Sequence, residues 1–334
     1  MKIGQHLIEP GQPPYVVAEI SGNHGGDIKN AIALIKAAKH AGADAAKTQC
    51  YEPDTITIDC KKLDFIVQNG LWQGRTLYEL YGKACTPLAW HKDLYRAAKD
   101  EGITLFSSVF DSSSVDLLET LGCPAYKIAS FEITDLPLIK YASQTGKPLI
   151  ISTGMATEDE ILDAWTMRSK EIAFLHCISE YPGRCESADL DRYLKLRAKF
   201  AGNPNVILGL SDHSPGDLVP TMAIALGACI IEKHLRLPDV DSEDASFSLD
   251  PTQFAIMVQT IKVAHQAMQP RKLQQAGRQF RRSLYAVNDI KKGEPFTLDN
   301  IRSIRPGYGL PPKMLPGLLG KPAARAFRRG DPLE

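Results

Sequence analysis

The sequence has no stretch of apolar residues long enough to cross a membrane as a helix. Its longest apolar runs, such as residues 148–151, are far shorter than the roughly 20 residues that a bilayer requires. The first 14 residues also lack the basic and then apolar pattern of a secretory signal peptide. We therefore expect a protein that neither spans a membrane nor is secreted.

Cysteines are few and scattered. Seven occur, and no two have the C-x-x-C spacing of a zinc or redox pair. An odd, scattered set is typical of thiols in a reducing compartment and argues against a disulfide framework. We expect a cytoplasmic protein whose cysteines are mostly buried thiols without a chemical role.

The formal net charge is zero, but the charge is unevenly distributed along the chain. Residues 270–334 contain 14 Lys and Arg against 5 Asp and Glu, whereas the remaining 269 residues contain 25 against 34. A basic C-terminal part beside an acidic N-terminal part indicates docking between them or an anionic ligand at their junction. The basic residues are spread among glycines and prolines rather than along one aromatic-bearing face, which disfavours nucleic-acid binding.

Short β-branched runs alternate with helical segments along most of the chain. Eight strands are predicted, at 15–20, 45–48, 104–107, 125–128, 149–152, 172–176, 206–210 and 229–232. Helices are predicted at 28–41, 89–101, 112–121, 136–145, 158–165, 189–200, 217–226 and 251–268. Eight β/α units predict a closed parallel (β/α)8 barrel. A doubly wound open sheet is the alternative, but no G-x-G-x-x-G follows the first strand.

Composition divides the chain into three segments. We predict a barrel domain at 1–269, a linker at 270–282 and a compact β-rich module at 283–334, which contains Pro-Gly turns. The total length suits one barrel of about 250 residues with a small added module. Residues 49–85 form a long insertion after the second strand, and such loops commonly shape access to a substrate.

Two lysines lie within otherwise apolar strands. Lys47 is preceded by Ala45-Ala46, and Lys127 lies between Tyr126 and Ile128. An inward-facing lysine is unfavourable unless a negative group accompanies it. Active sites of barrels lie at the carboxyl ends of the strands, where several serines occur in this chain. We predict that both lysines bind the phosphate and carboxylate of an anionic ligand, the alternative being solvated surface charges.

His213 and His234 end the last two predicted strands. Imidazole is a common ligand of divalent transition metals, and two imidazoles at matched height on adjacent strands can share one ion. We predict a metal site formed by His213 and His234, the alternative being two hydrogen-bonded structural histidines. His176, which ends an earlier strand, is predicted only to line the site.

Several ordered motifs resemble the sialic acid synthase family, the phosphoenolpyruvate (PEP)-dependent synthases of nonulosonic acids. They are Ala18-Glu19-Ile20-Ser21-Gly22-Asn23-His24, Lys47-Thr48-Gln49, Tyr126-Lys127-Ile128-Ala129-Ser130-Phe131-Glu132, Ser152-Thr153-Gly154-Met155, Gly209-Leu210-Ser211-Asp212-His213-Ser214 and Ile231-Glu232-Lys233-His234. The end of the chain, including Arg305-Pro306-Gly307-Tyr308-Gly309, resembles the antifreeze-like SAF domain of that family. The resemblance implies an α/β fold: a TIM barrel followed by a small β-rich SAF domain.

Within that family, the pseudaminic acid synthases resemble the chain most. The motifs that carry this resemblance are Gly70-Leu71-Trp72, Leu77-Tyr78-Glu79-Leu80-Tyr81, Thr86-Pro87-Leu88-Ala89-Trp90-His91 and Ser242-Glu243-Asp244-Ala245-Ser246-Phe247-Ser248-Leu249-Asp250. The implied reaction is a PEP-dependent transfer that joins PEP to 2,4-diacetamido-2,4,6-trideoxy-L-altrose, with C–O cleavage, and yields pseudaminic acid and phosphate. Synthases of N-acetylneuraminic or legionaminic acid are the nearest alternatives, and a non-catalytic sugar-binding barrel is a more distant one.

The resemblance also implies roles for residues at the strand ends. The PEP-binding residues are Lys47, Lys127, Ser130, Ser152 and Ser211. The metal ligands are His213 and His234, with Mn²⁺, or else Mg²⁺ or Co²⁺, activating the sugar aldehyde as a Lewis acid. The catalytic residues are these histidines together with Glu19 and Glu132, which orient water or move protons. The sugar-binding residues are Gln49, Tyr181, Asp244 and Arg305.

A domain-swapped homodimer is the assembly that the resemblance implies. In it, Arg305 of the SAF domain reaches into the neighbouring subunit's barrel and holds an N-acetyl group. A 6-deoxy sugar presents a methyl group where mannosamine has a hydroxyl, so an apolar contact from Phe131, Trp72 or Tyr78 suits it. The expected use of the product is decoration of a surface glycan or flagellin.

Overall fold

The computed structural model describes residues 1–168, 170–270 and 277–334. The chain forms two compact units, Met1–Gln269 and Pro270–Glu334, each with its own hydrophobic core. Residues 271–276, which belong to the predicted linker, lie outside the described residues. In the part of the chain that is described, no helix is both long enough and apolar enough to span a bilayer.

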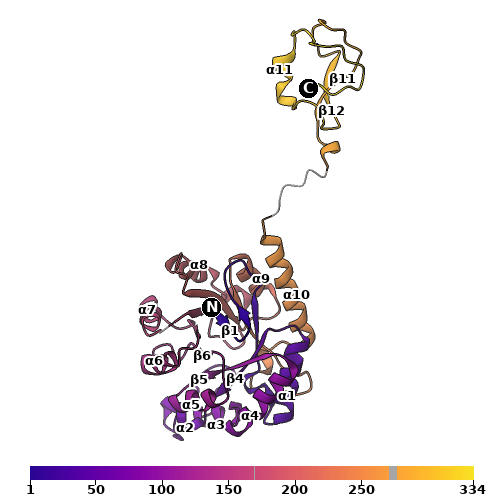
Figure 1. The fold of residues 1–334 in the computed structure, drawn as a ribbon. Helices are drawn as coiled ribbons and strands as arrows, with labels where there is room; N and C mark the ends of the chain where they lie inside the picture. The colour runs from indigo at the N-terminus through magenta and orange to yellow at the C-terminus, as the bar shows by residue number, and fades with distance from the viewer. Residues whose placement is uncertain (169, 271–276) are drawn as a thin grey trace. The chain divides into compact units, whose positions relative to one another are not determined.

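Eight parallel strands form a closed barrel in the first unit (Figure 1). They are β3 (Tyr15–Glu19), β4 (Ala45–Cys50), β5 (Thr104–Val109), β6 (Tyr126–Ile128), β7 (Leu149–Ser152), β8 (Ile172–His176), β9 (Val206–Asp212) and β10 (Ile230–His234). Each strand pairs with the next along the chain, and β10 pairs with β3 to close the ring. The barrel prediction is therefore confirmed.

Several strands extend further at the carboxyl end than their apolar runs predicted. β4 reaches Cys50 rather than Thr48, β9 reaches Asp212, and β10 reaches His234. The polar residues there continue the backbone ladder because neighbouring strands pair with them, as Glu19 pairs with His234. Gln49, Asp212 and His234 are thus held by strands rather than by loops.

Helices alternate with the strands and surround the barrel (Figure 1). They are α1 (Ile28–His40), α4 (His91–Glu101), α5 (Ser112–Thr120), α6 (Leu136–Gln144), α7 (Glu158–Thr166), α8 (Leu190–Lys199), α9 (Leu218–Ala225) and α10 (Pro251–Met268). In α1, one face spaced by three or four residues is buried: Ala31, Leu34, Ile35 and Ala38. Asp27 caps the start of this helix through its side chain. The helical periodicity of the sequence therefore identifies the faces that cover the barrel.

Gly209 in β9 lies where the adjacent strand leaves no room for a side chain. A Cβ there would be 2.5 Å from the carbonyl oxygen of Ile230 and 2.6 Å from Leu175 Cδ2. We expect Gly209→Ala to destabilise the barrel by about 1–3 kcal/mol, as overpacked cores do. Urea-induced unfolding measures the change, with Gly82→Ala as the control because its Cβ would meet only Pro53 Cγ, at 3.8 Å. Equal stabilities of the two variants would contradict this expectation.

The insertion after β4 contains two short helices, α2 (Pro53–Ile56) and α3 (Leu77–Ala84). Between them, Arg75 forms a 2.5 Å ion pair with Glu243, which lies in the segment after β10. The Trp72 ring packs against the Phe247 ring of the same segment, with centroids 6.4 Å apart. The insertion is therefore held against the chain that follows the last strand of the barrel.

The second unit is a small β-rich module. Its strands β11 (Ser283–Ala286) and β12 (Ile301–Ile304) pair antiparallel, and a short helix, α11 (Leu315–Leu318), follows. Its buried core includes Leu284, Ile290, Phe296, Ile301 and Phe327. At the other end of the chain, β1 (Lys2–Ile3) and β2 (His6–Leu7) form a separate hairpin.

Candidate functional site

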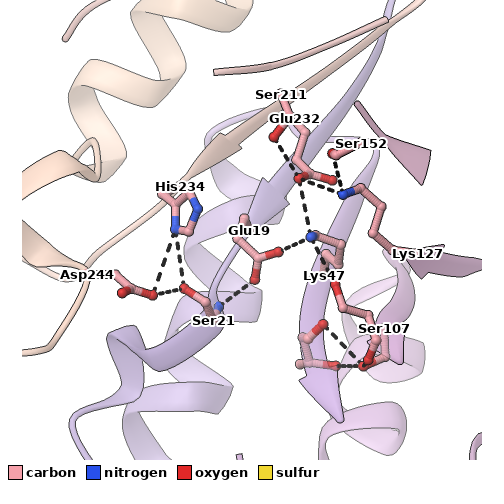
Figure 2. Close-up of polar contacts among 12 residues, drawn as sticks. Glu19, Ser21, Lys47, Ser107, Lys127, Ser152, Ser211, Glu232, His234 and Asp244 are labelled. Carbon is pink, nitrogen blue, oxygen red and sulfur yellow. Dashed lines mark hydrogen bonds and ion pairs between the residues drawn. The ribbon is translucent and has the colours of Figure 1, made fainter. Parts of the chain in front are cut away.

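Four charged side chains lie together inside the carboxyl end of the barrel (Figure 2). Glu19, Lys47, Lys127 and Glu232 come from β3, β4, β6 and β10, and they are 1%, 3%, 2% and 4% exposed. Burial of isolated charges is strongly unfavourable, so such a group persists only if its members pair with one another or serve a ligand. Lys47 and Lys127 both face the inside of the barrel, as the sequence predicted.

Glu232 is the shared partner of both lysines. Its Oε1 lies 3.2 Å from Lys47 Nζ and 3.7 Å from Lys127 Nζ. Ser211 donates a hydrogen bond to the same oxygen at 3.0 Å. Lys47 also forms an ion pair with Glu19. Lys47 thus has two carboxylate partners in this cluster, whereas Lys127 has one.

Each lysine also donates a hydrogen bond to a serine hydroxyl. Lys47 Nζ donates to Ser108 Oγ at 3.1 Å, and Lys127 Nζ donates to Ser152 Oγ at 2.6 Å. Cationic amines together with hydroxyl donors are the groups that bind phosphate and carboxylate oxygens. The arrangement can therefore bind an anion with two acidic groups.

Ser130 follows β6, and its hydroxyl lies 2.9 Å from the hydroxyl of Ser179. The backbone of Gly154 packs closely against this pair, since a Cβ there would lie 2.4 Å from Ser179 Oγ and 3.3 Å from Ser130 Oγ. Glycine is thus required at position 154 for the two serines to approach the chain after β7.

The pKa values of the cluster follow from its burial and its charges. Burial would lower the pKa of Lys47, but Glu19 and Glu232 outweigh it and raise that pKa above its usual value. Burial would raise the pKa of Glu232, but Lys127, Lys47 and a hydrogen bond from Ser211 hold it well below its usual value. Burial raises the pKa of Glu19, opposed by Lys47. Burial also lowers the pKa of Lys127, opposed by Glu232. Lys47 and Glu232 are therefore held in their charged forms.

His213 and His234 lie side by side next to this cluster, with ring centroids 5.4 Å apart. Burial lowers the pKa of both imidazoles, which favours their neutral forms. His213 Nδ1 lies 3.0 Å from the Ile178 carbonyl oxygen, which can only accept, so Nδ1 carries the proton and Nε2 keeps its lone pair. Such a neutral imidazole fits a divalent metal.

Carboxylates do not complete a metal site around these histidines. No group of three or more His, Cys, Asp or Glu that could hold a metal ion occurs among residues 1–168, 170–270 and 277–334. The pair therefore fits a metal only as two protein ligands, and the remaining ligands would come from substrate or water.

Glu132 follows β6 and is largely buried, and its Oε2 has no hydrogen-bond partner among the described residues. Burial raises its pKa to about 7, against the opposing charge of Lys127. A carboxyl group with such a pKa can give up or accept a proton near neutral pH.

We expect Glu132 to make folding stability fall as pH rises. A carboxyl whose folded pKa lies above its unfolded pKa stabilises fully at low pH, and this contribution is lost between about pH 4.5 and pH 7. The measurement is the melting temperature across that range for the wild type and Glu132→Gln. The variant should lose less stability than the wild type. Parallel curves would show that Glu132 titrates as an ordinary solvated carboxylate.

An aromatic wall, formed by the rings of Tyr181, Phe247 and Trp72, packs against the histidine pair. The Tyr181 ring lies 4.4 Å from that of His213, and the Phe247 ring lies 4.9 Å from that of His234. The Trp72 ring packs on Tyr181 at 6.0 Å. A cavity of about 920 Å³ next to this wall is lined by Trp72, His213 and Phe247 among others. This cavity can accommodate a sugar-sized ligand beside His213.

Two further residues predicted to bind the sugar lie close to the cluster. Asp244 Oδ2 is 4.0 Å from His234 Nδ1, and it accepts hydrogen bonds from Ser21 Oγ and, at 3.3 Å, from the Gly22 backbone N–H. Gln49 follows Lys47 by two positions on β4, which places both on the same face of the strand.

The three candidates for an apolar contact with the sugar lie in different surroundings. Trp72 lines the 920 Å³ cavity. The Phe131 side chain is 57% exposed, and Tyr78 donates a 3.1 Å hydrogen bond to Asp54. Neither of these two lines that cavity. Trp72 is therefore the one of the three that lines this cavity together with His213.

Two predicted residues make no contact with the cluster inside the first unit: the His176 side chain points away from it, and Arg305 belongs to the second unit. His176 Nε2 lies 2.8 Å from the Ala188 carbonyl oxygen, and its ring packs against Tyr193, so its side chain is on the helix side of β8. Arg305 lies in the second unit, where it is exposed and makes no ion pair within the described residues.

Several residues that lie in or beside the cluster were given no role of their own in the predictions from sequence. Glu232 precedes His234 by two positions on one strand, so strand alternation could have placed both inside the barrel. Ser108 could have been found in the same way from the end of β5. Ser179 and Ser21 lie in loops, where no periodic pattern predicts the direction of a side chain.

Comparison with known proteins shows similarity over nearly the whole chain. Residues 34–272 match the NeuB family, and residues 281–334 match the SAF domain. A pseudaminic acid synthase of Campylobacter jejuni subsp. jejuni serotype O:2 is 44% identical over 330 residues, which are 96% of this chain and 95% of that one. An N,N'-diacetyllegionaminic acid synthase of the same bacterium is 33% identical, covering 95% and 97%. The crystal structure of N-acetylneuraminic acid synthetase from Leptospira borgpetersenii matches with a TM-score of 0.72 and 28% identity, covering 84% and 94%. The chain therefore belongs to the NeuB family.

Proposed function

We propose that the protein condenses PEP with 2,4-diacetamido-2,4,6-trideoxy-L-altrose to give pseudaminic acid and phosphate. The observation that carries this proposal is the 44% identity, over nearly the whole of both chains, with a protein named pseudaminic acid synthase. The buried cluster of lysines and glutamates supports it, because an anion site adjoins two histidines that fit a metal. The 33% identity with a legionaminic acid synthase makes the corresponding mannose-configured sugar the second candidate.

In this proposal the phosphate and carboxylate of PEP bind to Lys47 and Lys127. The serines that donate to these acidic groups are Ser130, Ser152 and Ser211. Support comes from the hydrogen bond between Lys127 and Ser152 and from the position of Ser211 beside the shared carboxylate. Binding exchanges part of the internal ion pairing for pairing with the ligand, so the lysines are not left unpaired in either state.

The reaction forms one carbon–carbon bond, and at carbon 2 of PEP it forms a carbon–oxygen bond to water and breaks the one to phosphate. Carbon 3 of PEP attacks the aldehyde carbon of the open-chain sugar, whose oxygen takes up a proton and becomes a hydroxyl, while water adds at carbon 2, loses a proton, and phosphate leaves with the bridging oxygen. Glu132, with a pKa of about 7, is suited to take the proton from the water. Glu19, ion-paired with Lys47, is suited to orient the water or a sugar hydroxyl.

His213 and His234 would hold the divalent metal through their Nε2 atoms. When bound there, Mn²⁺, Mg²⁺ or Co²⁺ supplies Lewis-acid polarisation of the sugar aldehyde. Gln49, Tyr181 and Asp244 bind sugar hydroxyl or amide groups, and Trp72 offers the apolar surface that a 6-deoxy carbon requires.

We further propose that two subunits complete each site as a domain-swapped homodimer, in which Arg305 binds an N-acetyl group of the sugar. The exposure of Arg305, which has no ion pair within the described residues, and the basic composition of its unit support this role. Cytoplasmic location and use of the product in a surface glycan or flagellin stay predictions.

Phosphate release from PEP in the presence of Mn²⁺ tests the choice of sugar. We expect the diacetamido-trideoxy-altrose to support much faster release than the mannose-configured isomer or N-acetylmannosamine, because each pocket contact is made for one configuration. Faster release with the mannose-configured isomer would assign a legionaminic acid synthase. No release with any of the three sugars would contradict a synthase acting on them and would favour a sugar-binding protein.

A further inference from the structure

Ser21 adopts a backbone conformation that a serine rarely takes. It follows β3 as the first residue of a short 3-10 helix, its φ is 23°, and it is 1% exposed. A residue with a side chain in such a region costs on the order of 1–3 kcal/mol, and glycine would avoid most of that cost. Glycine would fit this backbone with less strain, so what the serine adds is the set of contacts that its hydroxyl makes.

Ser21 connects three residues of the site (Figure 2). Its backbone N–H donates to Glu19 Oε1 at 2.7 Å. Its hydroxyl donates to Asp244 Oδ2 and lies 3.2 Å from His234 Nδ1. These partners come from β3, from the segment after β10 and from the end of β10 itself. One small side chain therefore joins a candidate metal ligand to a buried carboxylate.

The count of protons determines the direction of these hydrogen bonds. Ser21 Oγ donates to Asp244 Oδ2, which accepts a second hydrogen bond from the Gly22 backbone N–H. A hydroxyl has a single proton, and once that proton is directed to Asp244, the Ser21 oxygen can only accept from His234. The proton of neutral His234 is therefore on Nδ1, and Nε2 keeps its lone pair. His213 reaches the same tautomer through the Ile178 carbonyl.

We propose that Ser21 is a positioning residue whose hydroxyl, anchored by Asp244, fixes the tautomer and ring orientation of His234 for binding of the divalent metal through Nε2. This inference rests on the proposed metal site at His213 and His234. Groups that hold a ligating histidine in this way typically contribute about 10–100-fold to metal affinity. Asp244 therefore acts on the metal through Ser21, in addition to its proposed contact with the sugar.

Replacement of Ser21 by glycine separates this role from a structural one. Glycine removes the hydroxyl and at the same time relieves the positive φ. We expect Ser21→Gly to bind Mn²⁺ about 10–100-fold more weakly in a direct calorimetric titration of the full chain. Its melting temperature should equal or exceed that of the wild type. Excess Mn²⁺ should restore much of its phosphate-release activity.

The matched control is Ser107→Ala, which also removes a buried serine hydroxyl, in this case from strand β5. Ser107 donates to the Thr48 backbone carbonyl at 3.1 Å and does not contact either histidine. We expect this variant to lose some stability and to keep the Mn²⁺ affinity of the wild type. A double-mutant cycle with Asp244→Asn should show non-additive losses of Mn²⁺ affinity, since both variants break one chain of hydrogen bonds.

The titrations distinguish failure of this inference from failure of the proposed metal site. If the wild type binds no Mn²⁺, or if His234→Ala binds it as the wild type does, the metal site itself is wrong. If His234→Ala loses binding while Ser21→Gly keeps the wild-type affinity, the positioning role of Ser21 is wrong and the metal site stands. A Ser21→Gly variant that loses stability together with Mn²⁺ affinity would also overturn the positioning role of Ser21. A purely structural role of the serine would then explain both losses.

Discussion

Glu232→Gln is expected to destabilise the folded barrel by about 3–5 kcal/mol, the usual cost of removing one partner from a buried ion pair. Glu232 is 4% exposed and pairs with both Lys47 and Lys127. The substitution keeps the shape of the side chain but removes its charge. Of the two lysines, Lys127 then has no carboxylate within ion-pair distance among the described residues. Urea-induced unfolding measures the loss.

A surface ion pair provides the control for this prediction. Glu158 is 70% exposed and lies 2.7 Å from Lys199, so Glu158→Gln should change stability by no more than about 1 kcal/mol. PEP brings negative charge to the same lysines, and we therefore expect it to raise the melting temperature of Glu232→Gln more than that of the wild type. Equal stabilities of the two variants would show that Glu232 is not the counter-charge of the lysines.

His234→Ala is expected to lower the rate of phosphate release by about 1,000-fold or more. Lewis-acid activation supplies several kcal/mol of transition-state stabilisation, and each 1.4 kcal/mol or so corresponds to a factor of ten. Removal of the metal from the wild type with EDTA should produce a loss of similar size, and added Mn²⁺ should reverse it. The variant should not respond to either treatment, because one of its two protein ligands is missing.

The matched control for His234→Ala is His40→Ala, which removes an exposed histidine at the end of α1. It should keep the wild-type rate and its sensitivity to EDTA. Full activity of the wild type in EDTA, or wild-type activity of His234→Ala, would contradict the assignment of His213 and His234 as metal ligands.

Most of the fold could be predicted from the sequence because it depends on local periodic patterns. The eight β-branched runs and the 3.6-residue periodicity of helices such as α1 identify the units of the barrel. The predicted positions of the strand ends were less accurate. The apolar signal stops at Leu210 in β9, whereas the ladder continues to Asp212 because its neighbours pair with it.

From the residues alone, the candidate site could be predicted only where a polar side chain lies on a strand or directly follows one, as His213 follows β9. Lys47, Lys127, His213 and His234 stood out because polar residues at the ends of apolar strands need an explanation. The side chains that pair with these residues come from other strands of the barrel. A single sequence does not show which strands face one another. Glu232 could still have been inferred from alternation with His234.

Contacts between distant loops could not be predicted. Ser21 and Asp244 are 223 positions apart, and their hydrogen bond depends on the conformations of two irregular segments. Trp72 lines the cavity beside His213 from a long insertion without a periodic pattern, so the sequence offered no means of choosing it over Tyr78 or Phe131.

The most direct test of the proposed reaction is the fate of the bridging oxygen of PEP. PEP labelled with oxygen-18 between carbon 2 and phosphorus is incubated with the protein, the diacetamido-trideoxy-altrose and Mn²⁺, and both products are analysed by mass spectrometry. Addition of water at carbon 2 followed by C–O cleavage predicts that the label leaves with phosphate and that the sugar acid is unlabelled. Label retained in the sugar acid would show cleavage of the P–O bond and would contradict the proposed roles of the site.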